Sequence, residues 1–169
     1  PEYRARVRPL CVIPVSRQRG KSDKIDRNVD AFRECYEVLE RGGVIGIFPE
    51  GISEMARRVR KIKTGAARIV LEAERRNKYE LGVKLIPIGL HFFSRSRFRS
   101  KVLVNVGRPI DLQSYFSLNE QDNIEAVSRL TDKIQDSLEN LTVHVQHSEL
   151  DRFVKDIESI YRDELMTQT

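Results

Sequence analysis

Two short apolar runs, separated by a segment with helical periodicity, constrain the fold of this chain more than any other feature. Residues 10–15 and 44–48 are rich in β-branched side chains and have the length of buried strands. Between them, apolar residues recur every three to four positions from 28 to 39, and a Gly-Gly pair follows at 42–43, as at the end of a helix. The connection is long enough for a crossover, so the two strands are predicted to be parallel and joined with right-handed topology.

The rest of the chain continues this alternation and ends in helices. The further predicted elements are a helix from about 65 to 73, strands at 83–89 and 102–106, and two amphipathic helical stripes at 124–138 and 150–161. The predicted fold class is therefore α/β: a mostly parallel sheet with flanking helices, in βαβαββ order, followed by a C-terminal helical pair.

The length of 169 residues suits one domain with a hydrophobic core. We expect a single domain in which residues 1–110 form the α/β core and residues 111–169 form an acidic helical extension. Cys11 and Cys35 lie within an apolar run and a helical pattern, without C-x-x-C spacing, so we interpret them as small buried residues of a reducing compartment. The sequence shows no set of convergent metal ligands.

The charge of the chain is distributed unevenly. Residues 1–110 contain 25 Lys or Arg against 12 Asp or Glu, whereas residues 111–169 contain 5 against 13. A basic surface favours an anionic partner, which can be phosphate, coenzyme A, an acidic lipid surface or nucleic acid. The alternative is a solvated surface whose charge is partly neutralised by the acidic tail of the same chain.

The apolar runs are too short for a transmembrane helix. They reach about six residues, against the roughly 20 that a membrane-spanning helix needs. The chain starts at Pro1, without an initiating Met, and runs directly into its first strand pattern. We therefore expect a fragment of a longer protein.

The residues with the most informative chemistry follow the second apolar run, in the order Phe-Pro-Glu-Gly-Ile-Ser from 48 to 53. Pro49 ends the predicted strand, and open α/β sheets bind ligands beyond the carboxyl ends of their strands. Glu50 can accept hydrogen bonds from substrate hydroxyls, and Gly51 lets a ligand approach the backbone. A salt bridge from Glu50 to a nearby arginine is the alternative interpretation.

A lysine at the start of the second helix supplies a candidate site for an anion. Lys63 precedes Thr64-Gly65, and the free N–H groups at a helix N-terminus favour negative charge. A carboxylate for hydroxyls together with a cation for phosphate suggests a phosphorylated polyol as ligand.

Two further kinds of polar residue are of interest for the site. At the end of the first apolar run, Arg17 can bind phosphate with two hydrogen bonds, or it can be a solvated charge. The three histidines, His91, His144 and His147, have no partner at a spacing typical of a catalytic dyad or triad, so we interpret them as structural or surface residues.

Taken in order, four sequence blocks resemble the glycerolipid acyltransferase family, which includes glycerol-3-phosphate and 1-acylglycerol-3-phosphate acyltransferases. The blocks are Ile-Pro-Val-Ser-Arg at 13–17, Phe-Pro-Glu-Gly-Ile-Ser at 48–53, Lys-Thr-Gly-Ala-Ala at 63–67 and Ile-Pro-Ile-Gly at 86–89. The resemblance covers most of the first 110 residues. It implies transfer of an acyl chain from acyl-CoA or acyl carrier protein, as a donor substrate rather than a cofactor, to a glycerol-phosphate acceptor. It also implies phospholipid biosynthesis at the cytoplasmic face of a membrane.

The resemblance also assigns roles to individual residues. Arg17 is expected to bind the acceptor phosphate, Glu50 and Gly51 to hold its glycerol part with help from Ser53, and Pro87 to shape the wall of the site. Lys63 suits the phosphate on physical grounds. In this family a His-x-x-x-x-Asp motif supplies the base. The 169 residues contain no such motif, because Ser96, Glu149 and Arg152 stand five residues after the three histidines. The fragment itself is therefore expected to be inactive.

A second function class remains open: a binding module without catalysis. Its basic clusters, at 57–63 and 95–101, would bind RNA or an anionic membrane surface. Phe92, Phe93 and Phe98 stand among the arginines of the second cluster, where they can stack on bases or lie at a lipid interface. A loop with a solvated basic face is the simpler alternative. Of the two partners, nucleic acid fits the acyltransferase resemblance less well than a membrane does.

Overall fold

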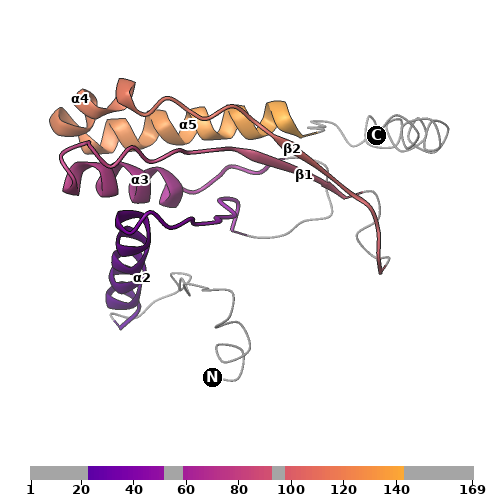
Figure 1. Cartoon of the computed structure of the whole chain (residues 1–169), viewed down its shortest axis with the longest axis horizontal. Coiled ribbons are helices and arrows are strands. Elements are labelled where there is room, and N and C mark those ends of the chain that lie inside the picture. Colours follow the sequence, from indigo (N-terminus) through magenta and orange to yellow (C-terminus); the bar gives the residue numbers. More distant parts are fainter. Residues whose placement is uncertain (1–22, 52–58, 93–97, 143–169) are drawn as a thin grey trace. The chain divides into compact units, whose positions relative to one another are not determined.

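The computed structural model describes residues 23–51, 59–92 and 98–142. Within these ranges the order of elements is α2 (Asp23–Glu40), α3 (Gly65–Arg76), β1 (Ile88–Phe92), β2 (Val102–Val106), α4 (Gln113–Gln121) and α5 (Asn123–Leu141) (Figure 1). The chain is thus mixed α/β. It divides into two compact units, one of Pro1–Ile47, Thr64–Val83 and Leu112–Val127, the other of Phe48–Lys63, Lys84–Asp111 and Ser128–Thr169.

The described part of the first unit is helical. Helix α2 ends as its glycines predict: the Gly42 N–H donates to the Leu39 carbonyl and the Gly43 N–H to the Val38 carbonyl, with Gly42 at φ +75°. Helix α3 buries nearly all of one face, and Ala67, Leu71 and Ala73 are fully buried. The predicted helices at 28–39 and 65–73 are therefore confirmed.

Polar and aromatic contacts join α2 to α3. The Arg76 guanidinium donates to Glu40 at 3.1 Å and lies over the Tyr36 ring at 5.2 Å from its centroid. Cys35 is buried, as expected, and burial raises the pKa of its thiol, with a smaller contribution from the Glu34 charge. Burial likewise raises the pKa of the Tyr36 hydroxyl, followed by the effect of Glu72.

Helix α4 was not predicted as a separate element. It packs against α3, where the Asn119 amide donates to the Leu71 carbonyl at 3.5 Å. It also contacts the segment that follows α3: the same amide donates to the Tyr79 hydroxyl at 3.0 Å, and the Phe116 ring centroid lies 4.5 Å from that of Tyr79. Asn119 is its buried residue, so α4 lacks the apolar stripe by which a helix is recognised in a sequence.

The second unit contains an antiparallel hairpin. Strands β1 and β2 lie side by side along their length, with Ile88 opposite Val106 and Phe92 opposite Val102 (Figure 1). The strand predicted at 83–89 begins later than expected, because Pro87 has no N–H to donate to a ladder. Before it, Leu85 forms an isolated bridge with Ile110, and the Pro87 carbonyl accepts the Gly107 N–H at 2.9 Å.

The strand predicted at 44–48 is not formed. This segment has no ladder partner among the described residues, and the sheet seen there has two antiparallel strands only. A strand needs a neighbour for its backbone groups, and the neighbour expected at 10–15 lies outside the described residues, as does the helix at 150–161. Val44 and Phe48 are 94% and 80% exposed. The mostly parallel sheet therefore stays a prediction, and so do the single domain and its division at residue 110.

The second half of α5 supplies much of the core of the second unit. Leu130 and Ile134 are buried there, together with Val59, Ile62 and Ile110. This confirms the helix predicted at 124–138. At its C-terminal end, the Leu141 carbonyl accepts a hydrogen bond from the Asn105 side chain at 2.9 Å, so one face of the hairpin lies against the end of the helix.

Candidate acceptor site

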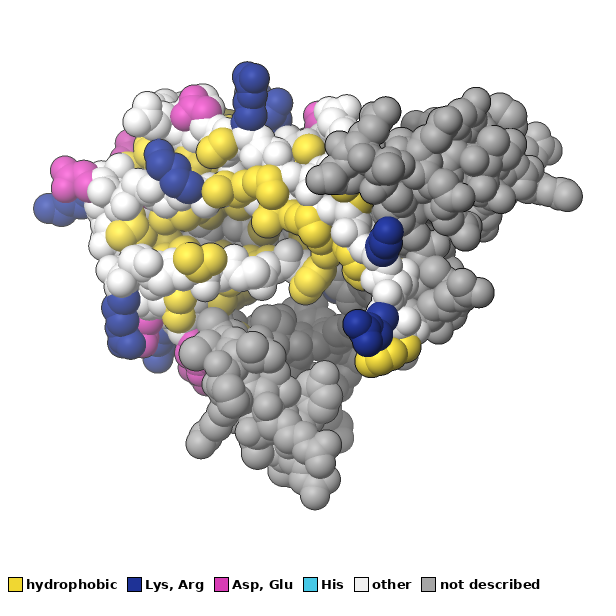
Figure 2. Space-filling view, turned by 45° about the vertical axis from the view of Figure 1, so that its right-hand side comes forward, with side chains coloured by type: hydrophobic (Ala, Val, Ile, Leu, Met, Phe, Trp, Pro, Cys, Tyr) yellow, Lys and Arg dark blue, Asp and Glu magenta, His cyan; other side chains and the backbone are white. Residues whose placement is uncertain are grey.

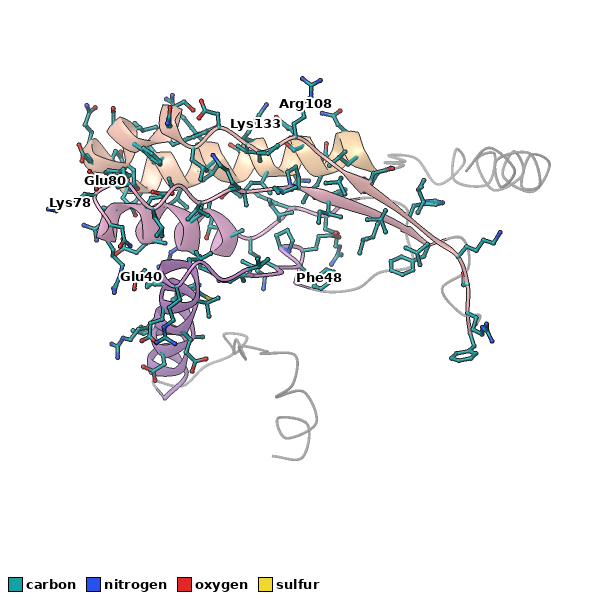
Figure 3. All side chains as sticks on the ribbon, in the orientation of Figure 1. Glu40, Phe48, Lys78, Glu80, Arg108 and Lys133 are labelled. Atoms are coloured by element: carbon teal, nitrogen blue, oxygen red, sulfur yellow. The ribbon has the colours of Figure 1, made fainter. Side chains whose placement is uncertain are left out.

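The Phe-Pro-Glu-Gly sequence at 48–51 folds into a tight turn. The Gly51 N–H donates to the Phe48 carbonyl at 3.2 Å, with Pro49 in the second position and Gly51 in the fourth. Proline and glycine favour these two positions of a reverse turn. Gly51 has φ +70°, which a residue with a β-carbon adopts only with strain. Figure 3 labels Phe48, whose ring is largely exposed where the turn begins.

A basic segment, residues 59–63, lies along this turn. The Lys63 N–H donates to the Pro49 carbonyl at 2.9 Å, and the Arg60 N–H donates to Glu50 Oε2 at 3.4 Å. Residues ten and fourteen positions apart are thereby joined by two hydrogen bonds. The structure thus brings together three of the predicted site residues, Glu50, Gly51 and Lys63.

The Lys63 side chain reaches directly over Gly51. A β-carbon at position 51 would lie 3.3 Å from Lys63 Cε and 3.3 Å from Nζ. The missing side chain of glycine therefore makes room for the ammonium group beside the turn. A carboxylate that accepts hydrogen bonds and an ammonium that donates them are chemically suited to hydroxyl and phosphate groups, respectively.

Helix α5 holds the basic segment in position. The Ile62 N–H donates to Gln135 Oε1 at 2.9 Å, and Gln135 Nε2 donates to Glu139 Oε1 at 2.6 Å. The Val59 and Ile62 side chains of this segment are buried. Sequence reasoning missed Gln135, because it lies 73 residues beyond Ile62 and carries no motif of its own.

Of the other predicted site residues, only Pro87 lies within the described ranges. Pro87 is buried at the base of the β1–β2 hairpin, where its carbonyl accepts the Gly107 N–H and its Cγ would lie 2.9 Å from a β-carbon at Gly107. Arg17 and Ser53 lie outside the described residues. Helix α3 begins at Gly65, two residues after Lys63, as predicted.

The described ranges contain no candidate metal centre and no membrane-spanning helix. No group of three or more His, Cys, Asp or Glu residues suited to hold a metal occurs within residues 23–51, 59–92 and 98–142. Over the same residues, no helix combines the length and the hydropathy that a bilayer crossing requires.

Comparison with known proteins links this turn to a family. A sequence model of the family described as Acyltransferase matches residues 3–91, a range that includes the turn and Lys63. "Glycerol-3-phosphate O-acyltransferase 2" of Saccharomyces cerevisiae is 35% identical over 122 residues, which make up 72% of this chain and 16% of that protein. "Glycerol-3-phosphate O-acyltransferase 1" of the same yeast is 29% identical over 148 residues, 86% of this chain and 19% of the relative.

A third relative comes from a different yeast. An uncharacterized acyltransferase of Schizosaccharomyces pombe is 28% identical over 148 residues, which make up 85% of this chain and 22% of that protein. The chain therefore spans less than a quarter of the length of each of these relatives. No solved structure matches the chain.

Proposed function

The chain belongs to the glycerolipid acyltransferase family, and we propose that its turn at 48–51 holds the glycerol-phosphate acceptor of an acyl transfer reaction. Two relatives are named for glycerol 3-phosphate, which carries the two groups that this turn suits, hydroxyls and a phosphate. The reaction joins an acceptor hydroxyl oxygen to the acyl carbon of a thioester. The carbon–sulfur bond breaks, and the thiol of coenzyme A or acyl carrier protein leaves with the proton of the hydroxyl.

The observation that carries this proposal is the position of the Lys63 ammonium over Gly51, next to Glu50. In the proposed complex, Lys63 binds phosphate oxygens and Glu50 accepts a hydrogen bond from a glycerol hydroxyl. Arg17 is proposed as a second phosphate ligand, Ser53 as a hydrogen-bonding partner of the glycerol, and Pro87 as part of the wall. Glu50 positions the acceptor and is not the base.

The proton of the acceptor hydroxyl is proposed to be taken by groups outside these 169 residues. The family motif His-x-x-x-x-Asp does not occur in them, and Glu50 is already oriented by the Arg60 N–H. We therefore propose that the chain alone is inactive, and that activity requires the protein made from the complete coding sequence. This protein is further proposed to act at the cytoplasmic surface of a membrane.

Steady-state kinetics of the complete protein test the acceptor role. We expect Glu50→Gln and Lys63→Met each to raise the KM for glycerol 3-phosphate about 10- to 100-fold, as expected for the loss of a hydrogen bond to a charged group. The KM for the acyl donor is expected to stay nearly constant. Lys61→Met is the matched control, because Lys61 is an exposed lysine of the same basic segment.

Other results would contradict the acceptor role. Equal losses in acceptor and donor kinetics would contradict a role in acceptor binding. An effect of Lys61→Met equal to that of Lys63→Met would show that Lys63 contributes only general positive charge. Lysophosphatidate as a second acceptor tests the chemistry further, because it shares the phosphate and differs in the glycerol hydroxyls. A variant that loses both acceptors to the same degree has lost a phosphate contact.

A non-catalytic role in binding RNA or an anionic membrane surface is the second candidate. Phe98, 95% exposed beside the cation Arg99, favours it, because exposed aromatic rings among cations stack on bases or lie at lipid interfaces. Binding of the 169-residue chain to single-stranded RNA, titrated with salt, tests the RNA form of this role. Tight, strongly salt-dependent RNA binding together with an inactive complete protein would favour it over acyl transfer.

A further inference from the structure

One face of the β1–β2 hairpin consists of apolar residues, and most of them are exposed. Residues that pair across the two strands point to the same face, and alternate residues along each strand share it. Six residues therefore form the outer hairpin face, namely Ile88, Leu90, Phe92, Val102, Val104 and Val106. Leu90 is half-buried and the other five are exposed, up to 66% at Val106.

Part of the opposite face of the hairpin lies against the end of α5. Gly89 and Asn105 are a cross-strand pair on that face. Asn105 donates to the Leu141 carbonyl, and a β-carbon at Gly89 would lie 2.9 Å from Leu141 Cβ. The contacts with α5 are therefore made by the opposite face, and the outer hairpin face takes no part in them.

The sequence of the hairpin and its flanks is basic. Residues 84–110 contain six Lys or Arg and no Asp or Glu. Arg99 and Lys101 precede β2 and Arg108 follows it, and all three are exposed. Figure 3 shows Arg108 directed away from the ribbon, and Figure 2 shows exposed hydrophobic side chains gathered in patches with Lys and Arg beside them. Apolar surface rimmed by cations is complementary to an anionic lipid surface.

We propose that the outer hairpin face, with Phe98, Arg99 and Lys101, is the surface that docks the protein on an anionic membrane. The proposal builds on the membrane association proposed above and assigns it to one element. Valine and isoleucine side chains bury well among acyl chains and give no stacking platform for bases, so the composition of the face favours lipid over RNA. Because a two-stranded hairpin does not pair all of its backbone groups internally, we expect it to lie flat at the headgroup boundary and not to cross the bilayer.

Tryptophan substitution offers a direct test, because the chain contains no Trp. In the 169-residue chain, Phe98→Trp introduces one indole at the hairpin. Its emission is expected to shift to shorter wavelength when vesicles of phosphatidylcholine and phosphatidylserine are added, and to be quenched by brominated acyl chains. Ile124→Trp is the matched control: Ile124 is an apolar residue on α5 that is also highly exposed, and its indole is expected to show neither change.

Vesicle co-sedimentation tests the charges. The chain is expected to bind phosphatidylserine-containing vesicles, more weakly at high salt, and to bind phosphatidylcholine vesicles poorly. Arg99→Gln with Lys101→Gln is expected to weaken binding about 25-fold, from about 5-fold for each cation. Phe98→Ser is expected to weaken it as well. Lys133→Gln removes an exposed cation from α5 and serves as the matched control (Figure 3).

Three results would overturn the assignment. If the chain binds vesicles and the hairpin variants bind equally well, another surface docks the protein. If the chain does not bind anionic vesicles at all, the hairpin is not a lipid-binding element. If the variants change the oligomeric mass of the chain and not its vesicle binding, the face is an interface between copies. None of these results bears on the acceptor role of Glu50 and Lys63, which is tested by kinetics.

Discussion

Gly51 is the residue on which the geometry of the candidate acceptor site most depends. It has φ +70°, and its missing β-carbon leaves the space beside which the Lys63 ammonium lies. Gly51→Ala is expected to cost about 1–2 kcal/mol of unfolding free energy, because alanine is strained in the left-handed region. It is also expected to push the lysine away and to weaken acceptor binding. Chemical denaturation measures the first effect, and the KM for glycerol 3-phosphate in the complete protein measures the second.

Gly82 provides the matched control for this substitution. It has φ +71°, but a β-carbon there would meet no atom within 4 Å. Gly82→Ala is therefore expected to carry the same backbone strain without an effect on the acceptor. If both alanine variants raise the acceptor KM to the same degree, loss of stability explains the result and the Gly51–Lys63 contact has no part in binding.

At the scale of single residues, the sequence predicts which side chains belong to this site. It does not predict the hydrogen bonds that hold them together. Glu50 and Gly51 are recognisable because turn-forming residues follow an apolar run, and Lys63 because it precedes a helix start. Their actual juxtaposition depends on backbone hydrogen bonds from the basic segment. Gln135 accepts a hydrogen bond from that segment, at the Ile62 N–H. In the sequence it cannot be told from any other polar residue on a helix, because only the tertiary fold brings it to Ile62.

Helix α3 carries a buried acidic side chain that ties it to the chain that follows. Glu74 is 1% exposed, and its Oε1 accepts the Val83 N–H at 2.6 Å. Its Oε2 is buried and has no hydrogen-bond partner among the described residues. Glu74→Ala leaves the Val83 N–H unpaired and opens a cavity, so we expect a loss of about 2–4 kcal/mol in unfolding free energy. Urea denaturation followed by circular dichroism measures it.

Glu72, two residues earlier in the same helix, is the control for this prediction. It forms an i,i+3 ion pair with Arg75 at 2.8 Å near the surface. Such pairs contribute little, so Glu72→Ala is expected to cost less than about 1 kcal/mol. Glu74→Gln keeps an acceptor oxygen for the Val83 N–H and is expected to lose less than Glu74→Ala. Equal losses for Glu72→Ala and Glu74→Ala would contradict a specific role for the buried carboxylate.

At the scale of elements, helices were predicted better than strands, for a physical reason. A helix satisfies its own backbone, so the apolar spacing in α2, α3 and α5 is enough to indicate it. A strand depends on its partner, and residues 44–48 show the consequence: they have the composition of a buried strand but form no ladder in the described structure. Strand β1 begins only at Ile88, because Pro87 before it has no backbone N–H to donate to the partner strand.

At the scale of the whole chain, one helix contributes residues to both compact units. The boundary between them falls between Val127 and Ser128, within α5. Ala126 and Val127 are buried in the first unit, and Leu130 and Ile134 in the second. The sequence predicts the apolar stripe of this helix. It does not predict that the stripe is divided between two units, because each unit is assembled from three separate segments of the chain.

A proline at the boundary tests whether α5 stabilises both units. Ser128 is exposed in the interior of α5, so Ser128→Pro removes no buried side chain. It removes one backbone hydrogen bond and clashes with the preceding turn, at a cost of about 3 kcal/mol. Amide hydrogen exchange is expected to become faster both in α3, within the first unit, and in β1 and β2, within the second. Ser128→Ala keeps the helix and is expected to leave exchange unchanged or slower. Faster exchange confined to one unit would mean that the other is stable without an intact α5.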